Sequence, residues 1–153
     1  MKTMQHLFAT FCLLLWWFVP QNVAAQGHYS FPLKDSTRQY VRLLFAGDAM
    51  QHSVQFKWAW DAKNRQYDYE PNFRYLRPYL ADADVSVVNF ETTLSGKPYG
   101  GYPKFRTPDA FFGALVDAGF QIFALANNHI LDGDKRGMQR TLRKMSAYPT
   151  MGA

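Results

Sequence analysis

Residues 122–133 read Ile122-Phe123-Ala124-Leu125-Ala126-Asn127-Asn128-His129-Ile130-Leu131-Asp132-Gly133. The stretch begins as an apolar run and then presents two amides, an imidazole and a carboxylate. An apolar run of this length, bounded by polar residues and glycine, is typical of a fully buried strand in a parallel sheet. Residues just past the carboxyl end of such a strand face the crevice in which open α/β sheets bind their ligands.

Two other predicted strands end in polar residues of the same kind. The strand at 40–46 is followed by Gly47 and Asp48, and the strand at 84–89 ends at Asn89, two residues before Glu91. Parallel strands carry their carboxyl ends at the same edge of a sheet. We therefore expect the three strand ends to converge on one site.

Helices are predicted after each of these strands, at 71–80, 108–118 and 134–145. The second begins at a proline and stops at Gly119, and the third carries its acid at the start and its bases towards the end, as the helix dipole prefers. Residues 54–70 lack clear periodicity and are predicted to form a long loop with at most one short helical turn. The alternation of strand and helix predicts right-handed βαβ units, a parallel sheet and an α/β fold.

The first 25 residues have the anatomy of a secretory signal peptide. A basic start at Lys2 leads into an apolar region at 7–19, and small residues at 23–25 precede Gln26. The apolar region is too short to favour a spanning helix, which needs about 20 residues. Cleavage would give an exported protein, periplasmic or associated with the cell envelope, without a spanning segment. The alternative is an uncleaved amino-terminal anchor.

Removal of that peptide leaves 128 residues (153 − 25), enough for one small domain with its own core. We expect a linker at 26–39 and the domain at 40–153. The lone Cys12 would leave with the peptide, so thiol chemistry is not expected. The remaining charge is +4 (16 Lys and Arg against 12 Asp and Glu). The bases on 134–145 are typical of a solvated helix face rather than a nucleic-acid surface, whereas a mild positive excess attracts anionic polymers or phosphorylated substrates.

Four stretches carry a more specific signal through their order and spacing. They are Leu44-Phe45-Ala46-Gly47-Asp48, Ala83-Asp84-Val85-Ser86-Val87-Val88-Asn89-Phe90-Glu91-Thr92-Thr93-Leu94, Phe105-Arg106-Thr107-Pro108 and Ala126-Asn127-Asn128-His129-Ile130-Leu131-Asp132. Together they resemble the amino-terminal half of the CapA-type capsule-biosynthesis family, the poly-γ-glutamate synthesis group of the calcineurin-like metallophosphoesterase superfamily. The resemblance covers the chain from about residue 41 to its last residue.

The resemblance implies the first half of a metallophosphoesterase-like α/β/β/α sandwich. Proteins of this family are about twice as long or more, with further metal ligands, mainly histidines, in their later half. Residues 148–153 are predicted to begin a further strand. We therefore expect this chain to be a fragment with an incomplete fold.

Asp48 is the first candidate metal ligand. Gly47 allows a sharp turn that aims the Asp48 carboxylate, a hard ligand, into the crevice; the alternative is an Asp that caps the next turn. The resemblance makes it the first metal-binding Asp of the superfamily. Its usual partner, a His two residues on, is replaced by Met50. His52 is the substitute candidate, and an ordinary loop histidine is the alternative.

Glu91 stands where the superfamily commonly has a metal-bridging Asp, and the CapA-type branch has the pattern Asn89-x-Glu91. The resemblance therefore implies a metal ligand at Glu91, with Asn89 supporting it. The longer Glu side chain changes the reach of the carboxylate and puts a bridging role in doubt. The alternative is that both side chains hydrogen-bond the loop that follows.

The Asn128-His129 pair matches the superfamily pair in which the Asn ligates a metal. The resemblance gives His129 the role of acid or electrostatic stabiliser near the leaving group, and an imidazole suits that role because its pKa lies near working pH. Asn127 and Asp132 are expected to orient these ligands.

These observations predict an exported CapA-like protein of capsule or surface-polymer metabolism with a metal-dependent, hydrolase-like site. A divalent ion such as Mn²⁺ or Zn²⁺ would activate a water there. The expected substrate is an anionic surface polymer of the poly-γ-glutamate type, or a phosphorylated or peptidic small molecule. Two alternatives stay open: a non-catalytic envelope factor that binds an anionic polymer, and an inactive truncated fragment.

Overall fold

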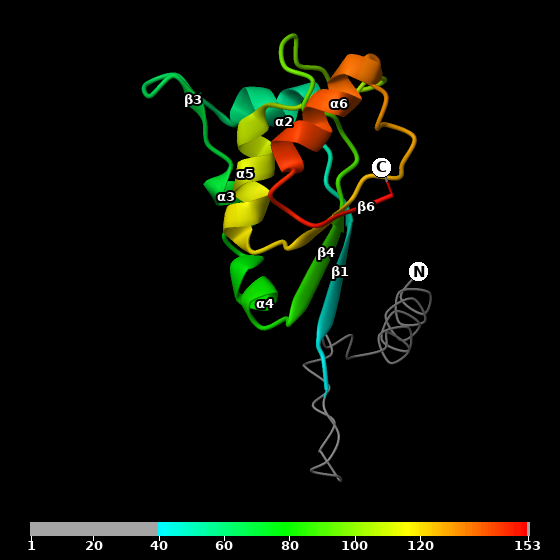
Figure 1. Ribbon diagram of the computed structural model, residues 1–153. Helices are drawn as coiled ribbons and strands as arrows, with labels where there is room; N and C mark the ends of the chain where they lie inside the picture. Colours follow the sequence, from blue (N-terminus) through cyan, green and yellow to red (C-terminus); the bar gives the residue numbers. More distant parts are fainter. Residues whose placement is uncertain (1–39, 153) are drawn as a thin grey trace, which may run out of the picture. The chain divides into compact units, whose positions relative to one another are not determined.

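The computed structural model describes residues 40–152, so the predicted signal peptide and linker lie outside the described residues. Four parallel strands form the main sheet in the order β1-β4-β5-β6 (Figure 1). Their bounds are β1 Leu43–Asp48, β4 Val85–Asn89, β5 Ile122–Ala124 and β6 Thr150–Met151. The predicted α/β fold of parallel βαβ units is confirmed, and so is the strand predicted within 148–153.

The two longer helices agree with the prediction. They are α5 Asp109–Ala118 and α6 Asp134–Met145. Gly119 ends α5 with a φ of 118°, in the left-handed region that favours glycine. The next backbone N–H, of Phe120, then donates to the Leu115 carbonyl at 3.1 Å.

Between β1 and β4 the prediction was wrong in two places. The expected loop at 54–70 contains α2 Ser53–Trp58 and an antiparallel hairpin of β2 Trp60–Asp61 and β3 Gln66–Tyr67. The expected helix at 71–80 is two short helices, α3 Glu70–Phe73 and α4 Arg77–Ala81, each with a proline in its first turn. Proline lacks an N–H and suits only a helix start, so Pro78 begins a second helix rather than continuing the first.

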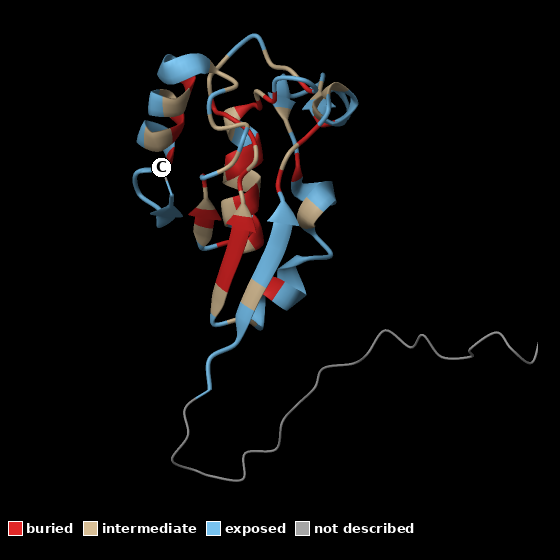
Figure 2. Cartoon of the chain, turned by 90° about the vertical axis from the view of Figure 1, so that its right-hand side faces the viewer, coloured by how far each residue is buried: buried red, intermediate tan, exposed pale blue. Residues whose placement is uncertain are grey.

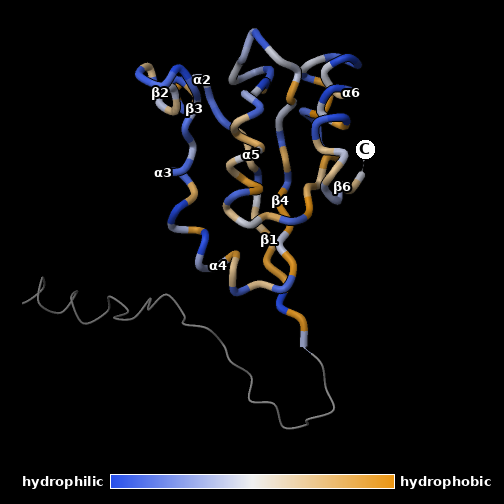
Figure 3. Tube along the Cα trace, turned by 60° about the vertical axis from the view of Figure 1, so that its left-hand side comes forward, coloured by the Kyte–Doolittle hydropathy of each residue, from blue (hydrophilic) through white to orange (hydrophobic). Residues whose placement is uncertain are grey.

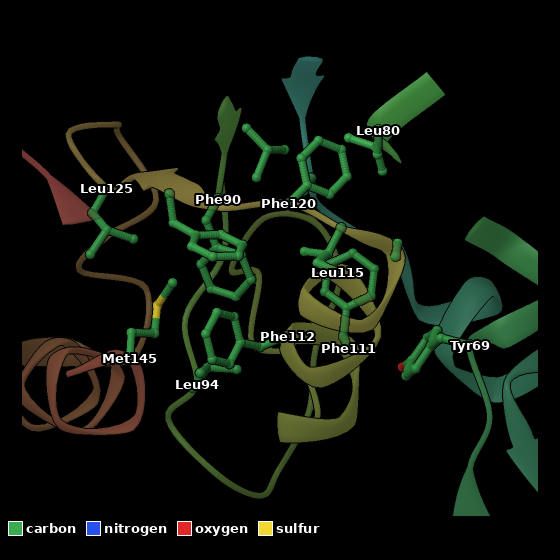
Figure 4. Packing of buried hydrophobic residues seen from close by; sticks show 14 of the residues in the cluster. Tyr69, Leu80, Phe90, Leu94, Phe111, Phe112, Leu115, Phe120, Leu125 and Met145 are labelled. Carbon is green, nitrogen blue, oxygen red and sulfur yellow. The ribbon is translucent and has the colours of Figure 1, made fainter. Parts of the chain in front are cut away.

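The core lies on one face of the sheet, where α5 packs against β4 and β5 (Figure 4). The rings of Phe112 on α5 and Phe123 on β5 meet edge to face at 5.0 Å, and Phe123 is fully buried. From α6, Met145 is also fully buried, although most of that helix is hydrophilic (Figure 3). Burying one such side chain stabilises the fold by about 1.5–3 kcal/mol.

The edge strand β1 is largely exposed, in contrast to the buried β4 (Figure 2). Leu44 packs against the core, whereas its neighbours Leu43 and Phe45 point to the opposite face and are 57% and 70% exposed. Within residues 40–152 no helix is both long and apolar enough to cross a bilayer.

Candidate functional site

Backbone hydrogen bonds hold the carboxyl ends of β1, β4 and β5 together. The Ala49 N–H donates to the Asn89 carbonyl at 2.7 Å, and the Glu91 N–H donates back to the Ala49 carbonyl at 3.1 Å. The Phe90 N–H donates to the Ala124 carbonyl of β5 at 2.9 Å. An irregularity in register between Ala46 and Asp48 pairs Asp48 with Asn89. The polar residues at all three strand ends therefore lie next to one another.

The amide of Asn89 is the centre of the cluster. Its Nδ2 donates to Asp48 Oδ1 at 2.8 Å and to Glu91 Oε2 at 2.7 Å. Its Oδ1 accepts from Asn127 Nδ2 at 3.1 Å. The Asn89 amide thus joins the carboxylates at the ends of β1 and β4 to Asn127, which lies beyond the end of β5.

Asn127 and Asp132 fix the position of His129. Asn127 Oδ1 accepts from the His129 backbone N–H at 3.1 Å. Asp132 Oδ2 lies 2.7 Å from His129 Nδ1. An acceptor-only carboxylate at this distance favours the proton on Nδ1. The other ring nitrogen, Nε2, is then directed to Glu91, with 3.8 Å between it and Oε1.

The cluster is shielded from water except at one side. The side chains of Glu91, His129 and Asp132 are only 15%, 16% and 12% exposed, whereas Asp48 is exposed. Burial and then the adjacent Asp48 carboxylate raise the pKa of Glu91, while His129 and the Asn89 hydrogen bond lower it in part. Glu91 therefore retains a proton to higher pH than a solvated glutamate.

Phe105 is a component of the site that sequence reasoning left without a role. Its backbone N–H donates to Asp132 Oδ2 at 2.5 Å. Its ring meets the His129 ring edge to face at 4.6 Å and the His52 ring at 5.2 Å. A backbone donor leaves no trace in residue type, so the only available signal was the Phe105-Arg106-Thr107-Pro108 stretch.

Two predicted ligands stay outside this network. Among residues 40–152 no hydrogen bond joins the side chain of His52 or Asn128 to the cluster. His52 precedes α2, where its N–H donates to Gln55 Oε1 at 2.6 Å, and Asn128 is exposed. Their roles as metal ligands stay predictions.

The carboxylate oxygens of the cluster are atoms of the kind that bind divalent ions, and they could form part of a ligand set. Carboxylate oxygens such as those of Asp48 and Glu91 are ligands that both Mn²⁺ and Zn²⁺ accept. Within residues 40–152 no group of three or more His, Cys, Asp or Glu side chains is arranged to hold a metal.

This fold and this cluster define an α/β protein with a polar, carboxylate-rich site at the carboxyl ends of a parallel sheet. Residues 42–153 match the family of bacterial capsule synthesis proteins termed PGA_cap, and the chain belongs to that family. It is 26% identical over 118 residues to the capsule biosynthesis protein CapA of Bacillus anthracis. That match covers 73% of this chain and 28% of the relative, so the chain spans little more than a quarter of the relative's length. The resemblance to CapA-type proteins is confirmed.

Proposed function

We propose that this protein is an exported factor of capsule or surface-polymer metabolism with a metal-dependent, hydrolase-like site at the ends of β1, β4 and β5. The observation that carries the proposal is the single Asn89 amide shared by two carboxylates, at 2.8 and 2.7 Å. Asp48 and Glu91 come from different strands, yet they lie side by side. Two adjacent carboxylates on one neutral donor concentrate negative charge, which favours a divalent cation.

In this proposal Asp48 and Glu91 supply oxygen ligands, and Asn128 and His52 are further candidates. The bound ion would supply an activated water and polarise the scissile group. Asp132 holds the Nδ1 side of His129 at 2.7 Å and leaves Nε2 free to face a leaving group, which it would protonate only when the ring carries a second proton.

The substrate class that we propose is an anionic surface polymer of the poly-γ-glutamate type, or a phosphorylated or peptidic small molecule. The positive balance of the mature chain supports this, since its formal charge would be +4 (16 Lys and Arg against 12 Asp and Glu). Export to the periplasm or cell envelope is supported by the signal-peptide pattern of the first 25 residues.

We also propose that the described sheet is the first half of an α/β/β/α sandwich. The support is the apolar, uncovered side of β1, where Leu43 and Phe45 are 57% and 70% exposed. Parallel strands of this kind are normally covered on both faces.

The second candidate function is a non-catalytic envelope factor that binds an anionic polymer, and its support is the same positive charge. An inactive fragment is the third. The three differ in whether the protein hydrolyses a substrate and in whether it binds the polymer.

The test measures two properties of the protein in Mn²⁺ or Zn²⁺: hydrolysis of p-nitrophenyl phosphoesters and poly-γ-glutamate, and binding of poly-γ-glutamate. A hydrolase should lose turnover in His129→Ala while keeping metal affinity, and should lose both in Asp48→Ala. Arg143→Gln, an exposed change on α6, is the matched control and should keep both. Polymer binding without turnover would support the binding factor. Turnover that survives both site variants would contradict the proposed site.

A further inference from the structure

A cavity of about 280 Å³ lies apart from the strand-end cluster, between the β2–β3 hairpin and α3 on one side and α5 on the other. These elements stand beside one another in Figures 1 and 3. None of the residues of the strand-end cluster lines the cavity. The cavity volume is close to the lower limit for small-molecule sites, which is about 300 Å³.

The floor of the cavity is a helix face without bulk. Ala110, Gly113, Ala114 and Asp117 line it, and their spacing along α5 puts them on one face. A Cβ added at Gly113 would meet nothing within 4 Å. The hollow therefore follows from the short side chains on this face of α5.

The wall opposite is aromatic and held in place. Tyr69 is 2% exposed, and its Oη donates to Gln51 Oε1 at 3.0 Å. Tyr67 stacks on Tyr69 with 6.2 Å between ring centroids and an interplanar angle of 15°. Contacts with the rings of Trp60, at 5.0 Å, and Tyr99, at 5.7 Å, also hold Tyr67 in place. The wall is thus preformed.

The rim is acidic, although the chain as a whole is basic. Asp68, Glu70 and Asp117 carry three carboxylates against one guanidinium from Arg77, a balance of −2 (1 − 3) in a chain of charge +5. Asp68 accepts the Glu70 N–H at 2.9 Å, and Glu70 lies 3.5 Å from Arg74. Within residues 40–152 no hydrogen bond or ion pair engages the Asp117 carboxylate.

We propose that this cavity binds an ammonium group on an apolar stem, as in the side chain of a lysine within a peptide. Carboxylates and the faces of aromatic rings both attract ammonium ions. The apolar floor and the Tyr67 ring fit the methylene stem of such a side chain. An anionic polymer would be repelled here, so the site is separate from the proposed function and does not rest on it.

The experiment is a titration of the full chain followed by ligand-observed NMR, with three matched probes. Nα-acetyl-lysine amide carries the ammonium, Nα-acetyl-norleucine amide has a similar stem without charge, and Nα-acetyl-glutamate amide has the opposite charge. The lysine probe should bind saturably and at least about threefold more tightly than either of the others, as expected for a partly exposed charge contact.

Two variants localise the binding. Asp117→Asn should weaken the lysine probe about two- to fivefold, as loss of an exposed charge contact does. Gly113→Leu should abolish binding by filling the cavity. Asp134→Asn removes the same charge from α6, which does not line the cavity, and should leave binding unchanged.

Folding does not confound these variants. Leucine is favoured over glycine inside a helix, and a Cβ at Gly113 meets nothing within 4 Å. Asp117 is exposed, so Asp117→Asn gives a second test that does not depend on the packing of α5. Absence of lysine-probe binding would overturn the proposal. So would equal binding of the norleucine probe, or binding that persists unchanged in both Gly113→Leu and Asp117→Asn.

Discussion

The ion pair between Arg140 on α6 and Asp109 at the start of α5 should contribute measurably to stability. Arg140 donates to the two carboxylate oxygens of Asp109 at 2.7 and 2.8 Å and also to the Leu94 carbonyl. Leu94 is three residues past Glu91, so this contact fastens the loop that leaves the candidate site. Lys144 lies 3.1 Å from the same carboxylate.

The magnitude follows from partial burial. The Arg140 and Asp109 side chains are 31% and 38% exposed. Exposed pairs contribute about 0.2–1 kcal/mol, and hydrogen bonds to charged groups about 1.5–3 kcal/mol. After discounting for solvent screening, we expect a coupling free energy of about 1 kcal/mol between the two side chains. Arg140→Met should lower the free energy of unfolding by about 1 kcal/mol beyond this coupling, because the Leu94 carbonyl also loses its donor.

The assay is urea unfolding followed by circular dichroism, on Arg140→Met, Asp109→Asn and the double variant, at low protein concentration. Lys144→Met is the matched control and should cost less than about 0.5 kcal/mol, because the Lys144 side chain is 50% exposed. A coupling free energy below about 0.3 kcal/mol at pH 7 would refute the reasoning, since that is the ordinary limit of additivity.

The pH dependence has a definite sign. The Arg140 hydrogen bonds lower the pKa of Asp109, with Lys144 assisting and burial opposing. A depressed carboxyl pKa contributes stability above the unfolded value, about pH 3.9, and loses it as pH falls through the folded value. The coupling should therefore persist from pH 7 to pH 5 and disappear at lower pH. A coupling that grows on acidification would contradict the assignment.

Three further predictions concern export, association and the His129 support. Amino-terminal sequencing of the exported protein should show cleavage after Ala25, whereas an intact start at Met1 would contradict export with cleavage. The mature chain should associate through the apolar side of β1, where Leu43 and Phe45 are exposed. Phe45→Lys should shift its sedimentation towards monomer, and a wild-type chain that already sediments as a monomer would refute this. Asp132→Ala should cost about 1–3 kcal/mol in urea unfolding, because two donors, one of them on His129, lose their acceptor; an unchanged midpoint would show that water replaces the carboxylate.

Local signals made parts of this fold predictable from sequence. The 134–145 helix was placed by its charge distribution, and α5 by Pro108 at its start and Gly119 at its end. The segment at 54–70 was not predictable in the same way, because its two-residue strands are stabilised by ring contacts such as Trp60 with Tyr67 at 5.0 Å. Strands this short carry no periodicity.

The candidate site, like the fold, could be predicted from the sequence only in part. Polar strand ends identified which residues meet, because the topology of a parallel sheet brings them together. The central position of Asn89 and the backbone donor of Phe105 were not visible, since both depend on side-chain geometry and on register. Residue type alone could not separate Asn127, which joins the network, from the exposed Asn128 beside it.

The central claim is that separate strand ends form one cation site, and calorimetric titration of Mn²⁺ into the protein tests it directly. Asp48→Asn and Glu91→Gln should each weaken binding at least about tenfold, since both would remove a ligand from the same ion. Their double variant should lose less than the sum of the two, because the ligands act on one ion. Asp134→Asn on α6 should bind as the wild type does. Wild-type affinity in both single variants would contradict the claim.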